Sequence, residues 1–159
     1  MQEYPKDVRI AYMMHPLPMH SQAGIAAEAA MAANDQGKFK EMHEKLAQNT
    51  GGLTRDKILE LARGLGLDMD RFTKDLDTNA HKAEIDRETQ EVMKIGATGT
   101  PATFVNGRFL SGAQPYEQFK KLVDEELAKL AKTTPSAAAP SGAQAPADAA
   151  KSPAKDGGN

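Results

Sequence analysis

The sequence predicts a mixed α/β domain, and three observations support this prediction. Apolar side chains alternate along one face of residues 8–14, which is typical of a strand. The pair Asn106 and Gly107 separates two short apolar runs, a strong signal for a β-hairpin because both central residues of a type I′ turn need positive φ. Between these two regions, apolar residues recur three and four positions apart, which is typical of helices.

Composition limits the classes of function. A length of 159 residues suits one domain, and a formal net charge of −2 argues against nucleic acid as a partner. No apolar run approaches the ~20 residues that a membrane span needs, and we expect no signal peptide in the polar residues 1–9. The chain contains no cysteine, so these residues provide no disulfide, thiolate metal ligand or thiol nucleophile.

The first elements in the chain are expected to be a strand and a helix. The strand over residues 8–14 should end before Pro16 and Pro18, because a proline cannot donate to a β-ladder. We expect Ser21 to cap an alanine-rich helix that extends to about Asn34.

Four further helices are predicted before the hairpin. A short one contains Phe39, Met42 and Leu46 on one face. Thr54 and Asp68 are expected to cap the next two, and Gly66 should end the first of these in the left-handed conformation.

A longer helix over residues 80–95 should end at Gly96, with these residues facing inward: Ile85, Thr89, Val92 and Met93. The hairpin strands are expected at residues 102–105 and 108–110, and Pro115 suits the first turn of a last helix. That helix is predicted to bury Phe119, Leu122, Val123, Leu127 and Leu130.

Residues 132–159 contain no large apolar residue, so we expect a disordered tail rich in Ala, Pro, Ser and Gly.

Several separated motifs carry a family resemblance. Gly99, Thr100 and Pro101 are followed by a strand, an Asn-Gly pair and the run Leu-Ser-Gly-Ala-Gln-Pro at residues 110–115. This pattern closely resembles the C-terminal half of DsbA-type thioredoxin-fold proteins, and residues 16–20 and 26–46 are similar to that family as well. The resemblance covers residues 1–131 and implies a thioredoxin-like fold with the DsbA-type helical insertion.

The resemblance also implies a site and two missing elements. In the family the proline equivalent to Pro101 is cis, and the backbone beside it holds extended polypeptide substrates, which implies substrate binding by Gly99, Thr100 and Pro101. The family's first strand and its active-site helix with a Cys-x-x-Cys motif are missing from this chain. That strand would lie between residues 8–14 and the hairpin. The two remaining pieces could pair directly, another chain could supply a strand, or the natural product could be longer with Met1 internal; we favour the last.

Three functional hypotheses follow. The first is a member or fragment of a thiol–disulfide oxidoreductase family, with no catalytic residue in this chain and no redox activity as it stands. A complete relative would pass electrons to a membrane redox partner, and such relatives mostly work in the periplasm or cell envelope. The second is a non-catalytic thioredoxin-fold module that binds peptides or acts as a chaperone. The third is a dimer in which two chains complete each other's sheets.

The histidines provide weak support for a metal site. His15 and His20 flank a Pro-Leu-Pro segment, whereas His43 and His81 fall on predicted helices. A pair of histidines five positions apart lacks a third ligand and an outer shell that would orient the rings. We therefore expect no metal and no cofactor.

Overall fold

The computed structural model of the protein describes residues 3–49 and 51–133. Over these residues the chain forms six helices and a two-stranded antiparallel sheet, so the predicted α/β class is confirmed. The elements in chain order are α1 (Ala23–Asn34), α2 (Phe39–Ala47), α3 (Arg55–Gly64), α4 (Met69–Thr78), α5 (Lys82–Lys94), β1 (Ala102–Val105), β2 (Arg108–Ser111) and α6 (Tyr116–Thr133).

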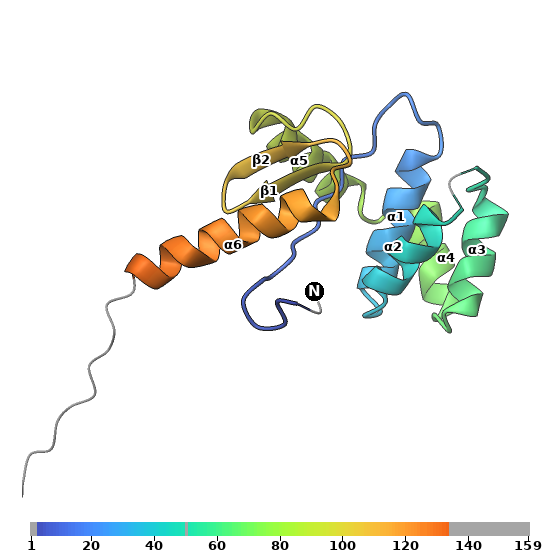
Figure 1. Cartoon of the computed structure of the whole chain (residues 1–159). Coiled ribbons are helices and arrows are strands. Elements are labelled where there is room, and N and C mark those ends of the chain that lie inside the picture. The colour runs from blue at the N-terminus through green and yellow to red at the C-terminus, as the bar shows by residue number, and fades with distance from the viewer. Residues whose placement is uncertain (1–2, 50, 134–159) are drawn as a thin grey trace, which may run out of the picture.

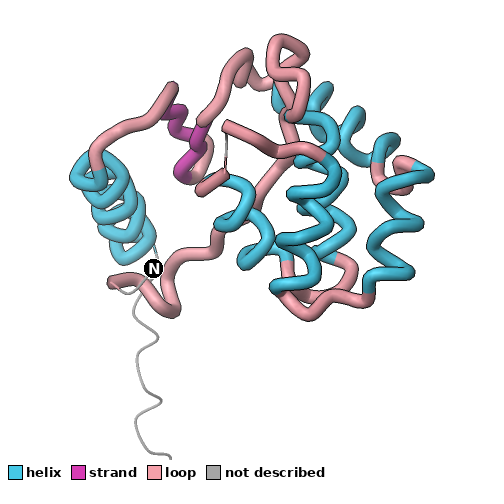
Figure 2. The backbone as a smooth tube through the Cα atoms, turned by 90° about the vertical axis from the view of Figure 1, so that its right-hand side faces the viewer, coloured by secondary structure: helices cyan, strands magenta, loops and turns pink. Residues whose placement is uncertain are grey.

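The elements form two groups. Helices α1 to α4 pack together on one side of the molecule, and the hairpin lies on the other side with α6 in front of it and α5 behind it (Figure 1). Seen from the side, the two strands stand between α6 and the remaining helices, and long loops connect the two groups (Figure 2). None of the helices in the described ranges is long and apolar enough to cross a membrane.

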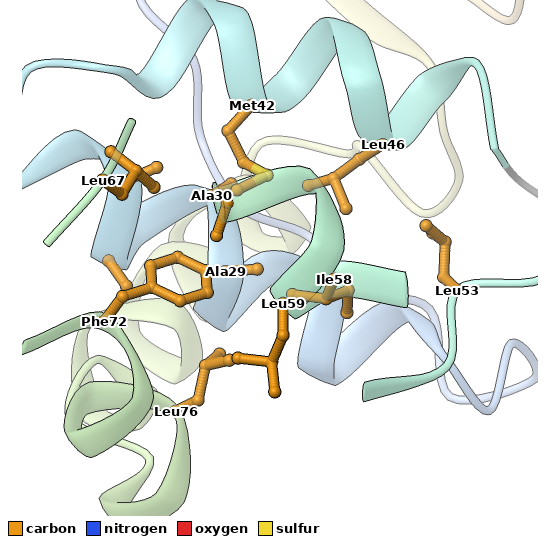
Figure 3. Close-up of a cluster of buried hydrophobic side chains, with 13 residues drawn as sticks. Ala29, Ala30, Met42, Leu46, Leu53, Ile58, Leu59, Leu67, Phe72 and Leu76 are labelled. Carbon is orange, nitrogen blue, oxygen red and sulfur yellow. The ribbon is translucent and has the colours of Figure 1, made fainter. Parts of the chain in front are cut away.

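The core lies among α1 to α4. Phe72, Met42 and Ile58 are the largest fully buried side chains, and they converge on the alanine-rich face of α1 (Figure 3). Ala29 and Ala33 on that face have no exposed surface. Because alanine is small, α2 and α4 can approach the α1 backbone closely and pack at the density of a protein interior.

Two of the three predicted helix caps are confirmed. The Thr54 hydroxyl accepts a hydrogen bond from the Lys57 amide at 3.3 Å, and the Asp68 carboxylate accepts one from the Arg71 amide at 3.1 Å. Gly66 has a φ of 70°, the left-handed conformation expected after α3.

The prediction that Ser21 caps α1 is wrong. The helix begins at Ala23, and the cap position is Gln22, whose side chain does not bond to the helix terminus. The His20 carbonyl already accepts from the Ala23 amide at 2.9 Å, so a tight turn takes over part of the role of a side-chain cap. The Gln22 side chain instead accepts a hydrogen bond from the Leu53 amide at 3.0 Å.

Burial on α5 and α6 differs from the prediction. Ile85 and Val92 are buried on α5, whereas Met93 is 54% exposed because it lies about 100° around the helix from Val92. On α6 four of the five residues expected to be buried are half-buried, and the fifth, Leu130, is exposed. This helix covers only one face of a small hairpin, so its apolar stripe has little surface to pack against.

The predicted strand over residues 8–14 is wrong. These residues form no ladder with any described segment, and Tyr12 is 50% exposed. A strand needs a hydrogen-bonded neighbour, and in the described part of the chain β1 and β2 pair only with each other. Direct pairing of residues 8–14 with the hairpin therefore does not occur.

Of the predicted tail, residues 132–133 complete α6, and residues 134–159 lie outside the described residues.

Candidate functional site

The hairpin has the geometry predicted from its turn residues. Ala102 pairs with Ser111, and Val105 pairs with Arg108. Asn106 and Gly107 have φ values of 47° and 85°, the positive angles of a type I′ turn. The turn type fixes the register of the two strands, and with it the position of the loop that leads into β1.

That loop contains the three residues predicted to bind substrate. Gly99, Thr100 and Pro101 are consecutive and exposed, and the Thr100–Pro101 peptide bond is cis. The Pro101 carbonyl accepts a hydrogen bond from the Gly112 amide at 2.9 Å, which extends the hairpin pairing by one residue. Within the described residues, no hydrogen bond engages the Thr100 amide or carbonyl. The loop therefore presents an exposed backbone edge beside an ordered ladder.

Charged residues hold the hairpin against α6. The Arg108 guanidinium on β2 donates a hydrogen bond to the Glu125 carboxylate and lies 3.5 Å from Glu126. The hydrogen bond to Glu125 raises the pKa of Arg108, and the same contact lowers the pKa of Glu125. A hydrogen bond from Lys129 lowers the pKa of Glu126. These contacts fix the far side of the hairpin and leave the loop before β1 open.

The N-terminal segment is attached to α6 by a second polar group. The Tyr4 hydroxyl donates to Asp124 at 2.5 Å, and the Lys120 ammonium donates to the Tyr4 oxygen at 2.8 Å. Lys120 also lies 3.0 Å from Glu3. The hydrogen bond to Asp124 raises the pKa of Tyr4, and the contact with Tyr4 raises that of Lys120.

A cleft of about 620 Å³ lies away from the predicted binding loop. It is bounded by the Pro-Leu-Pro segment, the start of α1, the end of α4 and the start of α5. Its charged lining residues Arg55 and Lys82 are paired with Asp77 at 2.6 Å and Asp86 at 2.5 Å. No residue of the predicted binding loop lines this cleft.

The four histidines considered in the sequence analysis do not form a common site. The ring nitrogens of His15 are enclosed and have no hydrogen-bond partner among the described residues, whereas His20 is exposed. His43 lies on α2, where its ring stacks on Phe39 at 5.7 Å between centroids. His81 is the cap residue of α5 and belongs to a different group.

This group contains Asp35, Asp75 and His81, which sequence reasoning missed. One ligand atom from each residue lies within 4.8 Å of the others. Their sequence separations are 40 and 6 residues, so they form no short motif that the sequence alone would indicate. Only the packing of α1, α4 and α5 brings them together.

Comparison with known proteins identifies the domain. A family model described as a DSBA-like thioredoxin domain matches residues 1–124. The crystal structure of a thioredoxin-like oxidoreductase from Silicibacter pomeroyi is similar, with a TM-score of 0.62, 28% identity, and coverage of 74% of this chain and 67% of that one. The thiol-disulfide exchange protein alpha-DsbA2 from Wolbachia pipientis has a TM-score of 0.60 and 26% identity, covering 76% and 63% of the two chains.

Curated relatives are longer than this chain. A Na(+)/H(+) antiporter NhaA 1 from Salinispora arenicola is 37% identical over 122 residues, which are 75% of this chain and 19% of the antiporter. A probable disulfide bond formation protein D from Bacillus cereus is 27% identical over 69% of this chain and 53% of its own length. The chain thus spans about a fifth of the first relative and about half of the second. With most of its length matched by the family model, the chain belongs to the DSBA-like thioredoxin domain family, and its fold is thioredoxin-like.

Proposed function

We propose that this chain binds extended polypeptides along the backbone of Thr100 and so acts as the substrate-holding part of a DsbA-like domain. The observation that carries the proposal is the exposed loop of Gly99, Thr100 and Pro101, in which the Thr100 amide and carbonyl have no hydrogen-bond partner among the described residues. A peptide in extended conformation can pair with such an edge through its main chain. Main-chain pairing tolerates many peptide sequences, as a general holder of unfolded substrates requires.

The family to which the chain belongs supports a link to thiol chemistry. Two of its relatives are named for thiol-disulfide exchange and for disulfide bond formation. Disulfide exchange needs a thiolate that attacks a disulfide sulfur, and these 159 residues contain no cysteine. We therefore assign the holding step to this chain and the electron transfer to cysteine side chains that it does not contain.

The test measures binding of a labelled, reduced and carboxymethylated unfolded polypeptide by fluorescence anisotropy. The variant Thr100→Pro removes the backbone N–H that would donate to the peptide. Loss of one main-chain hydrogen bond is worth about 0.5–1.5 kcal/mol, so affinity should fall about two- to tenfold. The matched variant Thr100→Val keeps the backbone donor and the side-chain shape and should bind as the unmodified protein does.

Two results would overturn the proposal. One is equal binding by Thr100→Pro and the unmodified protein; the other is no saturable binding by a protein that unfolds cooperatively. Far-UV circular dichroism and thermal unfolding of all three proteins show whether a loss of binding comes from a loss of fold.

A further inference from the structure

Potential metal ligands converge where three helices meet. Asp35 directly follows α1, Asp75 lies near the end of α4, and His81 directly precedes α5. Their ligand atoms all lie within 4.8 Å of one another. The group uses no residue of the peptide-binding loop.

Two potential ligand atoms of these residues are buried without a hydrogen-bond partner among the described residues. Asp75 Oδ2 and His81 Nε2 are enclosed, and neither has a hydrogen-bond partner within the described residues. The His81 side chain is only 12% exposed. Buried polar atoms almost always have a hydrogen-bond partner, an ordered water or a metal, because leaving them unsatisfied costs free energy. Two such atoms, in residues whose ligand atoms lie within 4.8 Å of one another, are consistent with a shared ligand.

The geometry suits a small tetrahedral cation. His81 Nε2 lies 3.5 Å from Asp35 Oδ2. An ion with bonds of about 2.0–2.1 Å to nitrogen and oxygen ligands holds those ligand atoms about 3.4 Å apart in tetrahedral geometry. The third ligand atom lies within 4.8 Å of the other two and would move toward them when an ion binds.

The surroundings hold the backbone of His81 in place. Glu28, a buried residue of α1, accepts a hydrogen bond from the His81 backbone amide at 3.1 Å. This contact fixes the start of α5, where His81 lies. Arg71 lies 3.4 Å from Asp35 Oδ2 and offsets part of the charge of the two carboxylates.

We propose that Asp35, Asp75 and His81 bind one divalent transition-metal ion, for which Zn²⁺ is the best match. Imidazole together with carboxylate ligands favours Zn²⁺ over Mg²⁺, which prefers oxygen ligands in octahedral geometry. The ion would link α1, α4 and α5 and so stabilise the junction between the helical group and the rest of the domain. The fourth position would hold water.

The experiment uses protein treated with EDTA and desalted, titrated with Zn²⁺ by isothermal calorimetry. We expect one saturable equivalent, a higher melting temperature with Zn²⁺, and no comparable effect of Mg²⁺. His81→Gln and Asp75→Asn should each weaken binding by about a hundredfold or more, since changes outside the ligand shell alone cost roughly 10- to 100-fold. The matched controls His20→Gln and Asp70→Asn change exposed residues outside the group and should bind normally.

A second measurement does not depend on variants. In ¹⁵N spectra of the histidine rings, Zn²⁺ should shift Nε2 of His81 and leave the His20 ring unchanged. If Zn²⁺ neither saturates nor shifts the His81 ring, or if the control variants lose binding as well, the proposal is wrong.

Discussion

The backbone amide of Met14 donates a 2.6 Å hydrogen bond to the side-chain carboxylate of Glu88. The Met14 carbonyl in turn accepts a hydrogen bond from the Thr89 hydroxyl at 3.3 Å. Both backbone groups are thus satisfied by side chains of α5 and not by a neighbouring strand. This contact holds the end of the N-terminal segment where the chain enters the loop before α1.

Replacing Glu88 tests how much this contact contributes to the free energy of unfolding. Glu88→Ala should lower the free energy of unfolding by about 1.5–3 kcal/mol, the range for hydrogen bonds to charged groups, because it leaves the half-buried Met14 amide without an acceptor. Urea denaturation measures the change. Glu91→Ala is the matched control: Glu91 is an exposed residue of the same helix and should change stability by no more than ~0.5 kcal/mol. Equal effects of the two substitutions would contradict the assigned role of Glu88.

The hairpin turn provides a second prediction. Gly107 has a φ of 85°, and an added Cβ would meet no atom within 4 Å, so the cost of Gly107→Ala is purely conformational. We expect a loss of roughly 1–2 kcal/mol from the left-handed backbone. Gly64 also has open space around it but has no positive φ, and Gly64→Ala should stabilise the last turn of α3 by up to ~1 kcal/mol. Opposite signs in thermal unfolding support the turn assignment, whereas a neutral Gly107→Ala would refute it.

The contacts of Arg108 predict a dependence of stability on pH. The pKa values of Glu125 and Glu126 are lowered in the folded protein, chiefly by hydrogen bonds from Arg108 and from Lys129. A carboxyl group whose pKa is lowered by folding stabilises the protein fully above its ordinary pKa of about 4.3, and this stabilisation is lost as pH falls through the folded-state value. Stability should therefore decline from about pH 5 downward.

The variant Arg108→Gln should reduce the part of this decline that comes from Glu125. Urea midpoints measured between pH 7 and pH 3 would show a shallower slope than in the unmodified protein. Arg87→Gln is the control, because its carboxylate neighbours on α5 lie farther away, at 3.7 and 4.0 Å. If Arg87→Gln flattened the profile as much as Arg108→Gln, the slope would reflect general charge and not the contact between β2 and α6.

Features set by local physical chemistry could be predicted from the sequence. The turn at Asn106 and Gly107 needs only residues that accept positive φ, and the caps at Thr54 and Asp68 need only a side-chain oxygen at the right position. The loop of Gly99, Thr100 and Pro101 can be predicted for a different reason, since it carries the family resemblance.

Features that depend on distant partners could not be predicted in this way. Residues 8–14 have the alternation of a strand but no neighbour to pair with in the described chain, so the alternation predicts a strand that does not form. The group of Asp35, Asp75 and His81 lies at the ends of three helices and has no sequence spacing that a pattern search would recognise. Such features depend on tertiary packing, which residue order alone does not show.

We expect extended polypeptides to bind at the loop before β1. Two-dimensional ¹H–¹⁵N spectra of the labelled protein, recorded while an unlabelled unfolded polypeptide is added, show where on the chain binding takes place. We predict that the largest shift changes fall on the amides of Gly99, Thr100 and Ala102. Changes gathered instead on the residues of the cleft between α1, α4 and α5, or no changes in a folded protein, would contradict the account.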